Sequence, residues 1–396
     1  MRKEENDPMA GTMEKYIARR FRAAGGGLTL DTEALRRYED VIDLSIGDTD
    51  FTTDRRVIEG AYRDALRGYT HYGDPKGDPE LIDGICAAWE EDFQQAVRPE
   101  EVLVTTSSCM GMAQALLALL EPGDEVIVLA PYFADYRNQI ELAGGRAVEV
   151  TCREEDGYLP REAALRAAVT PRTRALIVNT PCNPTGAAYG ADTLSMLARV
   201  AQEQDLLVLA DEIYTRYLYD GAFIPMRTLP GMRERTVTLN SFSKNFLMTG
   251  WRVGYIIAHP ELIGAFQRVN DGLTYVAPSV SQRAAIWALR LRQEIADEYI
   301  SVYRRRVYAA CDALQEMDYL TVTRPRGTFY LFPGIGKTGL EDGAFRQLAL
   351  EEAHVLVSPG SAFGTAGRGH FRIACTVDDA RLAQAMERLR ALGSRF

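Results

Sequence analysis

Short apolar runs alternate with helix-like segments through most of the chain. Strand candidates, which share compact runs of mostly apolar residues, lie at residues 102–105, 125–130, 146–150, 175–179, 206–210, 236–240 and 254–258. In the segments that separate or follow them, apolar positions return at helical spacing, at about residues 110–120, 132–143, 193–204 and 259–269. Near-continuous apolar strands separated by helices indicate a mostly parallel sheet covered on both faces.

A second, smaller α/β layer is predicted after a long helical region at residues 279–315. Its strand candidates are residues 320–323, 327–332, 354–358 and 369–376, with helices at 342–353 and from 378 onward. Residues 1 to about 40 are polar and charged, and a short strand candidate follows at 42–47. The predicted fold class is α/β, with an N-terminal arm and part of the small domain at 1–45, a three-layer large domain at 46–285 and a small domain at 286–396.

Composition narrows the classes of function. The 396 residues carry a formal net charge of −10, which disfavours nucleic acid or an anionic membrane as a partner of the whole chain. The first residues are charged and lack an apolar signal region, and no apolar run approaches the roughly 18–20 residues that span a bilayer. We therefore expect a cytoplasmic enzyme.

Cysteine and histidine spacing disfavours metal chemistry. The six cysteines are scattered without a C-x-x-C pair, which predicts reduced, mostly buried thiols and neither disulfides nor zinc. The four histidines show no metal-ligand spacing, so no metal site is predicted and a His-centred hydrolytic triad is disfavoured.

Polar residues follow the ends of three predicted strands. Ligands of such sheets collect beyond the carboxyl ends of the strands. Ser108 and Cys109 follow the first strand and precede a helix, Asn183 lies in a proline-stiffened N-P-T-G loop, and Asp211 and Tyr214 follow the strand at 206–210. The serine and the aspartate also suit ordinary helix capping, and the tyrosine suits packing on the sheet, so the pattern of each residue alone leaves two interpretations.

The stretch Ser241–Tyr255, S-F-S-K-N-F-L-M-T-G-W-R-V-G-Y, carries the most specific candidate chemistry. Lys244 lies just beyond a strand, with Ser241 and Ser243 before it and Arg252 after it. Burial and nearby positive charge help a lysine to lose its proton, and hydroxyls with an arginine suit a phosphate. A lysine for a carbonyl beside donors for a phosphate matches the needs of pyridoxal phosphate (PLP). The alternative is a turn with an exposed, solvated lysine.

Three further candidates lie outside this stretch. Gly47 ends the strand at 42–47, where glycine permits close approach of the backbone to a ligand or simply makes a turn. Tyr72 lies in a glycine- and proline-rich loop that is either a surface turn or a binding loop. Arg372 alternates with apolar neighbours on a predicted strand, as a solvated edge arginine or as an anchor for a carboxylate.

Together, the S-x-S-K-x-x-x-x-x-G-x-R stretch, the N-P-T-G loop and the D-E-x-Y strand end resemble the class I/II aminotransferases. These belong to the aspartate aminotransferase superfamily of fold-type I PLP enzymes, and the resemblance covers about residues 42–390. It implies that Lys244 holds PLP as an internal aldimine. It further implies that Asp211 pairs with the pyridine nitrogen and that Asn183 and Tyr214 donate to the phenolic oxygen.

The resemblance assigns the remaining candidates as well. The phosphate-holding positions are Ser108, Cys109, Ser241, Ser243 and Arg252, and Tyr132 would stack on the cofactor. Arg372 would bind the substrate α-carboxylate, with Gly47 as a backbone donor and Asn183 nearby. Tyr72 of the partner subunit would reach the phosphate, which implies a homodimer with shared active sites.

Two departures from the family pattern bear on the substrate. Thr49 stands where proline is usual, close to where the N-terminal arm closes over the substrate. Cys109 falls where some aspartate-selective relatives carry lysine, which argues against selectivity for acidic side chains.

The resulting hypothesis is an exchange of an amino group between an L-α-amino acid and a 2-oxo acid. The main alternative is a PLP-dependent C–S β-lyase, a decarboxylase or another Cα-bond-cleaving enzyme. A more remote alternative is the PLP-binding domain of a regulator, although the first 40 residues are too short for its DNA-binding part.

Overall fold

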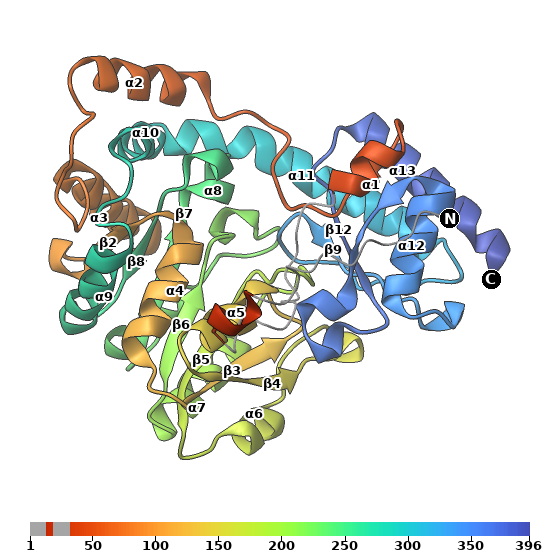
Figure 1. Ribbon diagram of the computed structural model, residues 1–396, viewed down its shortest axis with the longest axis horizontal. Helices are drawn as coiled ribbons and strands as arrows, with labels where there is room; N and C mark the ends of the chain where they lie inside the picture. Colours follow the sequence, from red (N-terminus) through yellow and green to blue (C-terminus); the bar gives the residue numbers. More distant parts are fainter. Residues whose placement is uncertain (1–12, 19–31) are drawn as a thin grey trace.

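Seven strands form the central sheet of the protein. The structure is a computed structural model that describes residues 13–18 and 32–396 (Figure 1). Its strands run in one direction except β8, which is antiparallel to both of its neighbours. The mostly parallel sheet predicted from the apolar runs is therefore confirmed. In spatial order the strands are β2 (Val102–Thr105), β8 (Gly254–Ile257), β7 (Thr236–Ser241), β6 (Leu207–Asp211), β5 (Thr173–Asn179), β3 (Glu125–Ala130) and β4 (Arg146–Thr151).

Two hydrophobic cores lie on the two faces of this sheet because successive residues of a strand point to opposite sides. Val126 and Val128 of β3 pack in one core, and Ile127 and Leu129 pack in the other. The sheet is the middle of three layers. Its covering helices are α4 (Ser107–Leu119), α5 (Asp135–Leu142) and α9 (Pro260–Leu273) at the first core and α6 (Glu162–Ala168) and α7 (Ala191–Glu203) at the second.

The smaller layer combines the start of the described chain with its C-terminal part. β1 (Ile42–Asp43) pairs in parallel with β10 (Val355–Leu356), so segments far apart in sequence lie side by side. β12 (Phe371–Ala374) lies antiparallel between β11 (Ser358–Pro359) and β9 (Tyr330–Leu331). The domain boundaries at 45 and 285 stay a prediction, and residues 1–12 and 19–31 of the expected arm lie outside the described part. The helices around these strands are α1 (Thr32–Arg37), α11 (Arg292–Gln315), α12 (Asp342–Ala353) and α13 (Asp379–Ala391) (Figure 1).

Some elements differ from the prediction. Helix α2 (Arg55–Leu66) was not predicted, although its apolar residues return at helical spacing, and only Val57, Gly60, Ala61 and Asp64 of it are buried. The helical region at 279–315 is two helices, α10 (Ser279–Arg290) and α11, separated at Leu291. The predicted strand at 320–323 forms only an isolated bridge between Thr321 and Gly334. Within the described residues, no helix is both long and apolar enough to cross a membrane.

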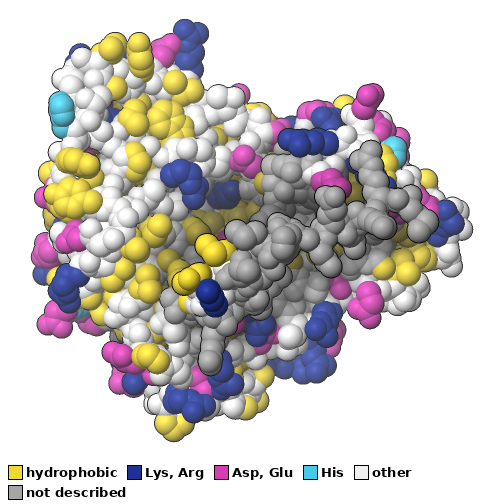
Figure 2. Space-filling view, in the orientation of Figure 1, with side chains coloured by type: hydrophobic (Ala, Val, Ile, Leu, Met, Phe, Trp, Pro, Cys, Tyr) yellow, Lys and Arg dark blue, Asp and Glu magenta, His cyan; other side chains and the backbone are white. Residues whose placement is uncertain are grey.

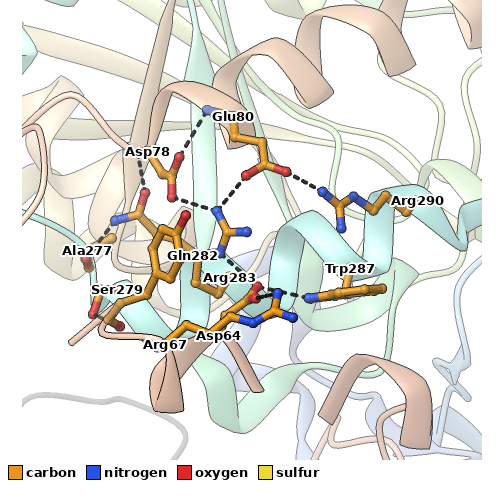
Figure 3. A network of polar contacts seen from close by, with 11 residues as sticks. Asp64, Arg67, Asp78, Glu80, Ala277, Ser279, Gln282, Arg283, Trp287 and Arg290 are labelled. Atoms are coloured by element: carbon orange, nitrogen blue, oxygen red, sulfur yellow. Dashed lines mark hydrogen bonds and ion pairs between the residues drawn. The ribbon is translucent and has the colours of Figure 1, made fainter. Parts of the chain in front are cut away.

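A buried arginine ties α2 and α10 to the segment that enters α3 (Pro79–Phe93) (Figure 3). Arg283 of α10 donates from Nε to Asp64 Oδ2 at 2.9 Å, and its Nη1 lies 3.2 Å from Asp78 Oδ2 and 2.7 Å from Glu80 Oε2. Trp287 also donates to Asp64 Oδ2, at 3.0 Å. Buried charges are stable when they are paired in this way. The network fixes both ends of the loop that carries Tyr72.

Candidate active site

A cavity of about 650 Å³, the large cavity, lies between the strand ends of the central sheet and the smaller layer. β5 and β6 supply Asn179 and Asp211 to its wall, and the turn after β7 supplies Lys244. From the smaller layer come Tyr330 of β9 and Arg372 of β12. Both layers must therefore assemble before this site exists.

Lys244 lies in α8 (Phe242–Asn245), a single helical turn that begins directly after β7. Ser241 caps this turn by accepting a hydrogen bond from the backbone N–H of Ser243 at 3.1 Å. The Lys244 ammonium donates to the carbonyl oxygen of Gly47. Burial, aided by the positive charges of Arg372 and Arg252, lowers the pKa of Lys244 to about 8. Much more of this amine is neutral near pH 7 than for an ordinary lysine, which suits a nucleophile.

Asp211 ends β6 with one carboxylate oxygen bonded and the other open. Tyr136 of α5 donates its hydroxyl to Oδ2. Oδ1 is buried and has no hydrogen-bond partner. Burial raises the pKa of Asp211 to about 6, although the Tyr136 hydrogen bond opposes this shift. A buried acceptor without a donor is costly, so Oδ1 marks a place where a ligand N–H would be stabilised.

Arg372 is only 3% exposed and has no carboxylate partner within the described residues. Its Nη1 donates to Asn183 Oδ1 at 3.0 Å, and its Nη2 donates to the carbonyl oxygen of Ser45. Its Nε is buried without a hydrogen-bond partner. Burial lowers the pKa of Arg372, as expected for a cation that lacks a counter-ion. The guanidinium is therefore prepared for an anionic ligand in the large cavity.

A second cavity of about 140 Å³, the small cavity, adjoins the large one at shared wall residues that include Asp211 and Lys244. Its other polar lining residues include the five that were predicted to hold a phosphate, Ser108, Cys109, Ser241, Ser243 and Arg252. The first residues of α4 lie here, so backbone N–H groups and hydroxyls gather beside an arginine. That donor set suits a phosphate group. A Cβ on Gly254 would lie 2.7 Å from the Ser108 nitrogen, so glycine lets α4 begin close against β8.

The remaining wall of the large cavity contains a tyrosine pair. Tyr214 donates its hydroxyl to the Tyr330 hydroxyl at 3.2 Å. The Tyr330 ring packs against the Arg372 guanidinium, 4.5 Å from ring centre to Cζ. A Cβ on Gly47 would lie 1.7 Å from the Tyr330 hydroxyl, which explains the glycine. Sequence reasoning missed Tyr330 because it belongs to no recognised motif, although it lies within a predicted strand.

The structure brings all but two of the predicted site residues to these cavities. Tyr132 lines neither: its hydroxyl donates to Glu149 at 2.8 Å, and its neighbour Phe133 lines both cavities instead. The role predicted for Tyr132 has no support in this geometry: α5 begins at Asp135 and not at 132, and of the two neighbouring aromatic residues it is Phe133 that lines the cavities. Tyr72 also lines neither cavity and is 86% exposed, with its ring edge-on to Tyr275.

Comparison with known proteins identifies the family. A model of the family described as aminotransferase class I and II matches residues 39–389. The chain belongs to this family. The aminotransferase is 37% identical to the aspartate/prephenate aminotransferase of Thermus thermophilus, over 91% of this chain and 93% of the relative. It is also 37% identical to aromatic-amino-acid aminotransferase 2 of Thermococcus litoralis, over 89% and 91% of the two chains.

Solved structures confirm the fold of the aminotransferase. The aromatic aminotransferase of Pyrococcus horikoshii superposes with a TM-score of 0.88 at 38% identity, covering 92% of this chain and 99% of that one. The α/β fold with a mostly parallel sheet, the family and the transferase activity predicted from the sequence are therefore confirmed.

Proposed function

We propose that this aminotransferase uses PLP held by Lys244 to move an amino group between an L-α-amino acid and a 2-oxo acid. The observation that carries the proposal is the meeting of the two cavities at Lys244 and Asp211. A site for an anionic phosphate thereby adjoins a site in which Arg372 has no carboxylate partner among the described residues, and Lys244, whose pKa is lowered, lies between the two sites.

The residues present fit PLP group by group. The buried Asp211 Oδ1 would accept a hydrogen bond from the pyridine nitrogen, and the small cavity would hold the phosphate with Ser108, Ser243 and Arg252. Asn183 and Tyr214 line the large cavity and carry donors for the phenolic oxygen. Phe133 lines both cavities and replaces Tyr132 as the aromatic residue beside the ring.

The chemistry of the chain follows from these positions. When bound, PLP supplies an aldehyde that takes up the amino group and a ring that delocalises the electron pair left when Cα loses its proton. Arg372 binds the substrate α-carboxylate and thereby orients Cα toward Lys244. The neutral Lys244 amine would then remove the Cα proton as a general base and deliver it to the former aldehyde carbon, which lies on the other side of the amino nitrogen. Asp211 holds a negative charge where a protonated ring nitrogen is needed.

Amino transfer can be separated from the β-lyase and decarboxylase alternatives by its products. The purified enzyme with PLP should form a new amino acid from an added 2-oxo acid, in equal amount to the 2-oxo acid made from the amino donor. Release of ammonia from cysteine-type substrates, or of CO₂, without a need for an added 2-oxo acid would contradict the proposal.

An exposed apolar surface supports the proposed homodimer. Figure 2 shows apolar side chains gathered over the part of the surface formed by α2 and the segment that follows it. Exposed patches of this kind mark interaction sites in otherwise polar surfaces. Tyr72 lies within the patch, which agrees with the proposal that it contributes to the site of the partner subunit. The exposed apolar residues of α2 and the following segment are Ile58, Tyr62, Leu66, Tyr69 and Tyr72, and the exposed Tyr275 adjoins them through its ring contact with Tyr72.

The proposed compartment is the cytoplasm, in agreement with six cysteines that form no disulfide. The names of the relatives give different substrates, aspartate or the 2-oxo acid prephenate in one case and aromatic amino acids in the other. Family membership alone therefore does not determine which substrate side chain this enzyme accepts. That specificity must come from the residues that line the large cavity.

A further inference from the structure

Asp135, the first residue of α5, is a carboxylate in the large cavity that the reaction described above does not use. It is half-buried in the cavity wall. Among the described residues, its side chain has no hydrogen-bond donor and no ion-pair partner. Burial raises its pKa, and no neighbouring cation opposes that shift. A carboxylate left in this state would be stabilised by a positively charged ligand.

The other charged groups of the site already have partners or assigned roles. Lys244 donates to Gly47, Asp211 accepts from Tyr136, and Arg372 donates to Asn183 and Ser45. Two more charged side chains line the large cavity: Glu33, which is exposed, and Arg346, which is half-buried and already interacts with another group of the protein. Among the acidic side chains of the cavity wall, Asp135 is therefore the half-buried one that has neither a hydrogen-bond donor nor a cation beside it in the described residues.

A purely structural role for Asp135 does not account for its surroundings. Acidic residues at a helix N-terminus stabilise the helix when they are solvated or cap its N–H groups. The α5 N-cap is Ala134, and no side chain caps this helix end. A role at the helix end would also leave the half-buried Asp135 carboxylate in the cavity wall without a hydrogen-bond donor among the described residues.

The cofactor is not the missing partner either. Its phosphate is an anion, and the donors that suit it line the small cavity, where Asp135 is not part of the wall. Its ring nitrogen has Asp211 as an acceptor. What remains in the large cavity is the substrate, whose α-carboxylate and amino group are taken by Arg372 and the cofactor. Only its side chain is left to meet Asp135.

We propose that Asp135 selects amino acids whose side chain ends in a cationic group, a guanidinium or an ammonium, by accepting a hydrogen bond from that group. This inference rests on the proposed function and adds the substrate class to it. A cation beside the Asp135 carboxylate gains a charge-assisted hydrogen bond, whereas an acidic side chain meets like charge. Cys109 at the edge of the small cavity adds no positive charge that would favour an acidic substrate.

The test compares each cationic amino acid with a neutral amino acid of similar shape. Single-turnover loss of the visible absorbance of the lysine-bound cofactor is measured with arginine against citrulline and with lysine against norleucine, and alanine serves as the reference substrate. In the natural enzyme, kcat/KM should be at least about tenfold higher for a cationic member than for its neutral counterpart, as expected for one charge-assisted hydrogen bond.

The variant Asp135→Asn keeps the shape of the side chain and removes its charge. The ratio of kcat/KM for the cationic substrate to that for alanine should fall about tenfold, with the change mainly in KM. Glu141→Gln is the matched control, because Glu141 lies on the same helix, is exposed and lines neither cavity. Its ratio should stay at the value of the natural enzyme.

A binding measurement checks the same contact without turnover. The compound 5-guanidinopentanoate has the carboxylate and guanidinium of arginine but no α-amino group, and hexanoate is its neutral counterpart. Calorimetry should show tighter binding of the guanidinium compound to the holoenzyme, and Asp135→Asn should abolish the difference.

The outcomes separate the two proposals. If alanine or aromatic amino acids react but cationic ones show no preference, or if glutamate and aspartate react best, the inference about Asp135 is overturned and amino transfer stands. If no amino acid changes the absorbance of the cofactor-loaded enzyme, the proposed function itself fails.

Discussion

Replacing Arg372 by methionine tests the substrate anchor, because it removes the guanidinium and keeps most of the side-chain volume. Arg372 is buried and unpaired with any carboxylate in the described part of the chain, and its Nε has no partner. Two charge-assisted hydrogen bonds to the substrate α-carboxylate, at about 1.5–3 kcal/mol each, amount to about 3–6 kcal/mol. We therefore expect kcat/KM for every amino acid to fall by about 10²–10⁴-fold, mostly through a higher KM.

Stability distinguishes this role from a structural one. Removing a buried cation that lacks a counter-ion relieves a desolvation cost, so Arg372→Met should leave Tm nearly unchanged or raise it. Arg283→Met is the contrasting variant, because Arg283 neutralises Asp64, Asp78 and Glu80 far from the cavities. Breaking that network should lower stability by about 3–5 kcal/mol. The reasoning is refuted if Arg372→Met retains the KM of the natural enzyme, or unfolds as readily as Arg283→Met.

Three further predictions follow from other contacts. Tyr136→Phe removes the hydrogen bond that lowers the pKa of Asp211, so any acid limb of the kcat pH profile set by Asp211 should move to higher pH; an unmoved limb would show that this contact does not tune the carboxylate. Because Lys244 must be neutral to bind PLP and its pKa is about 8, uptake of PLP by the apoenzyme should accelerate as pH rises from 6.5 to about 8.5 and then level off; a rate independent of pH over this range would contradict the lowered pKa. Leu66→Glu places a charge on a residue that is 72% exposed in the apolar patch, so light scattering should show a shift from dimer toward monomer, and an unchanged dimer would place the interface elsewhere.

Part of this architecture could be predicted from the sequence because its signals are local. Strands such as β3 and β6 are continuous apolar runs, since both of their faces are buried. The carboxyl ends of parallel strands meet at one edge, which is why Asn183, Asp211 and Lys244 could be expected together.

The rest depends on contacts that sequence patterns do not encode. Tyr330 reaches the site from β9 of the smaller layer, and its hydroxyl lies where a Gly47 side chain would be. Phe133 and Tyr132 are neighbours, and the start of α5 decides which of them faces the cavities. Tyr136 bonds to Asp211 across 75 positions in the chain, and helical spacing alone gives no sign of that partner.

The central claim is that Lys244 carries the cofactor and moves the Cα proton, and the Lys244→Ala variant tests it most directly. Lys337→Ala is the matched control, because Lys337 is exposed and lines neither cavity. With PLP added, we predict that Lys244→Ala keeps the circular dichroism and Tm of the natural apoenzyme. It should lack the visible absorbance of the lysine-bound cofactor and transfer no measurable amino group. Lys337→Ala should show both the absorbance and the amino transfer of the natural enzyme. Near-normal amino transfer by Lys244→Ala would contradict the account.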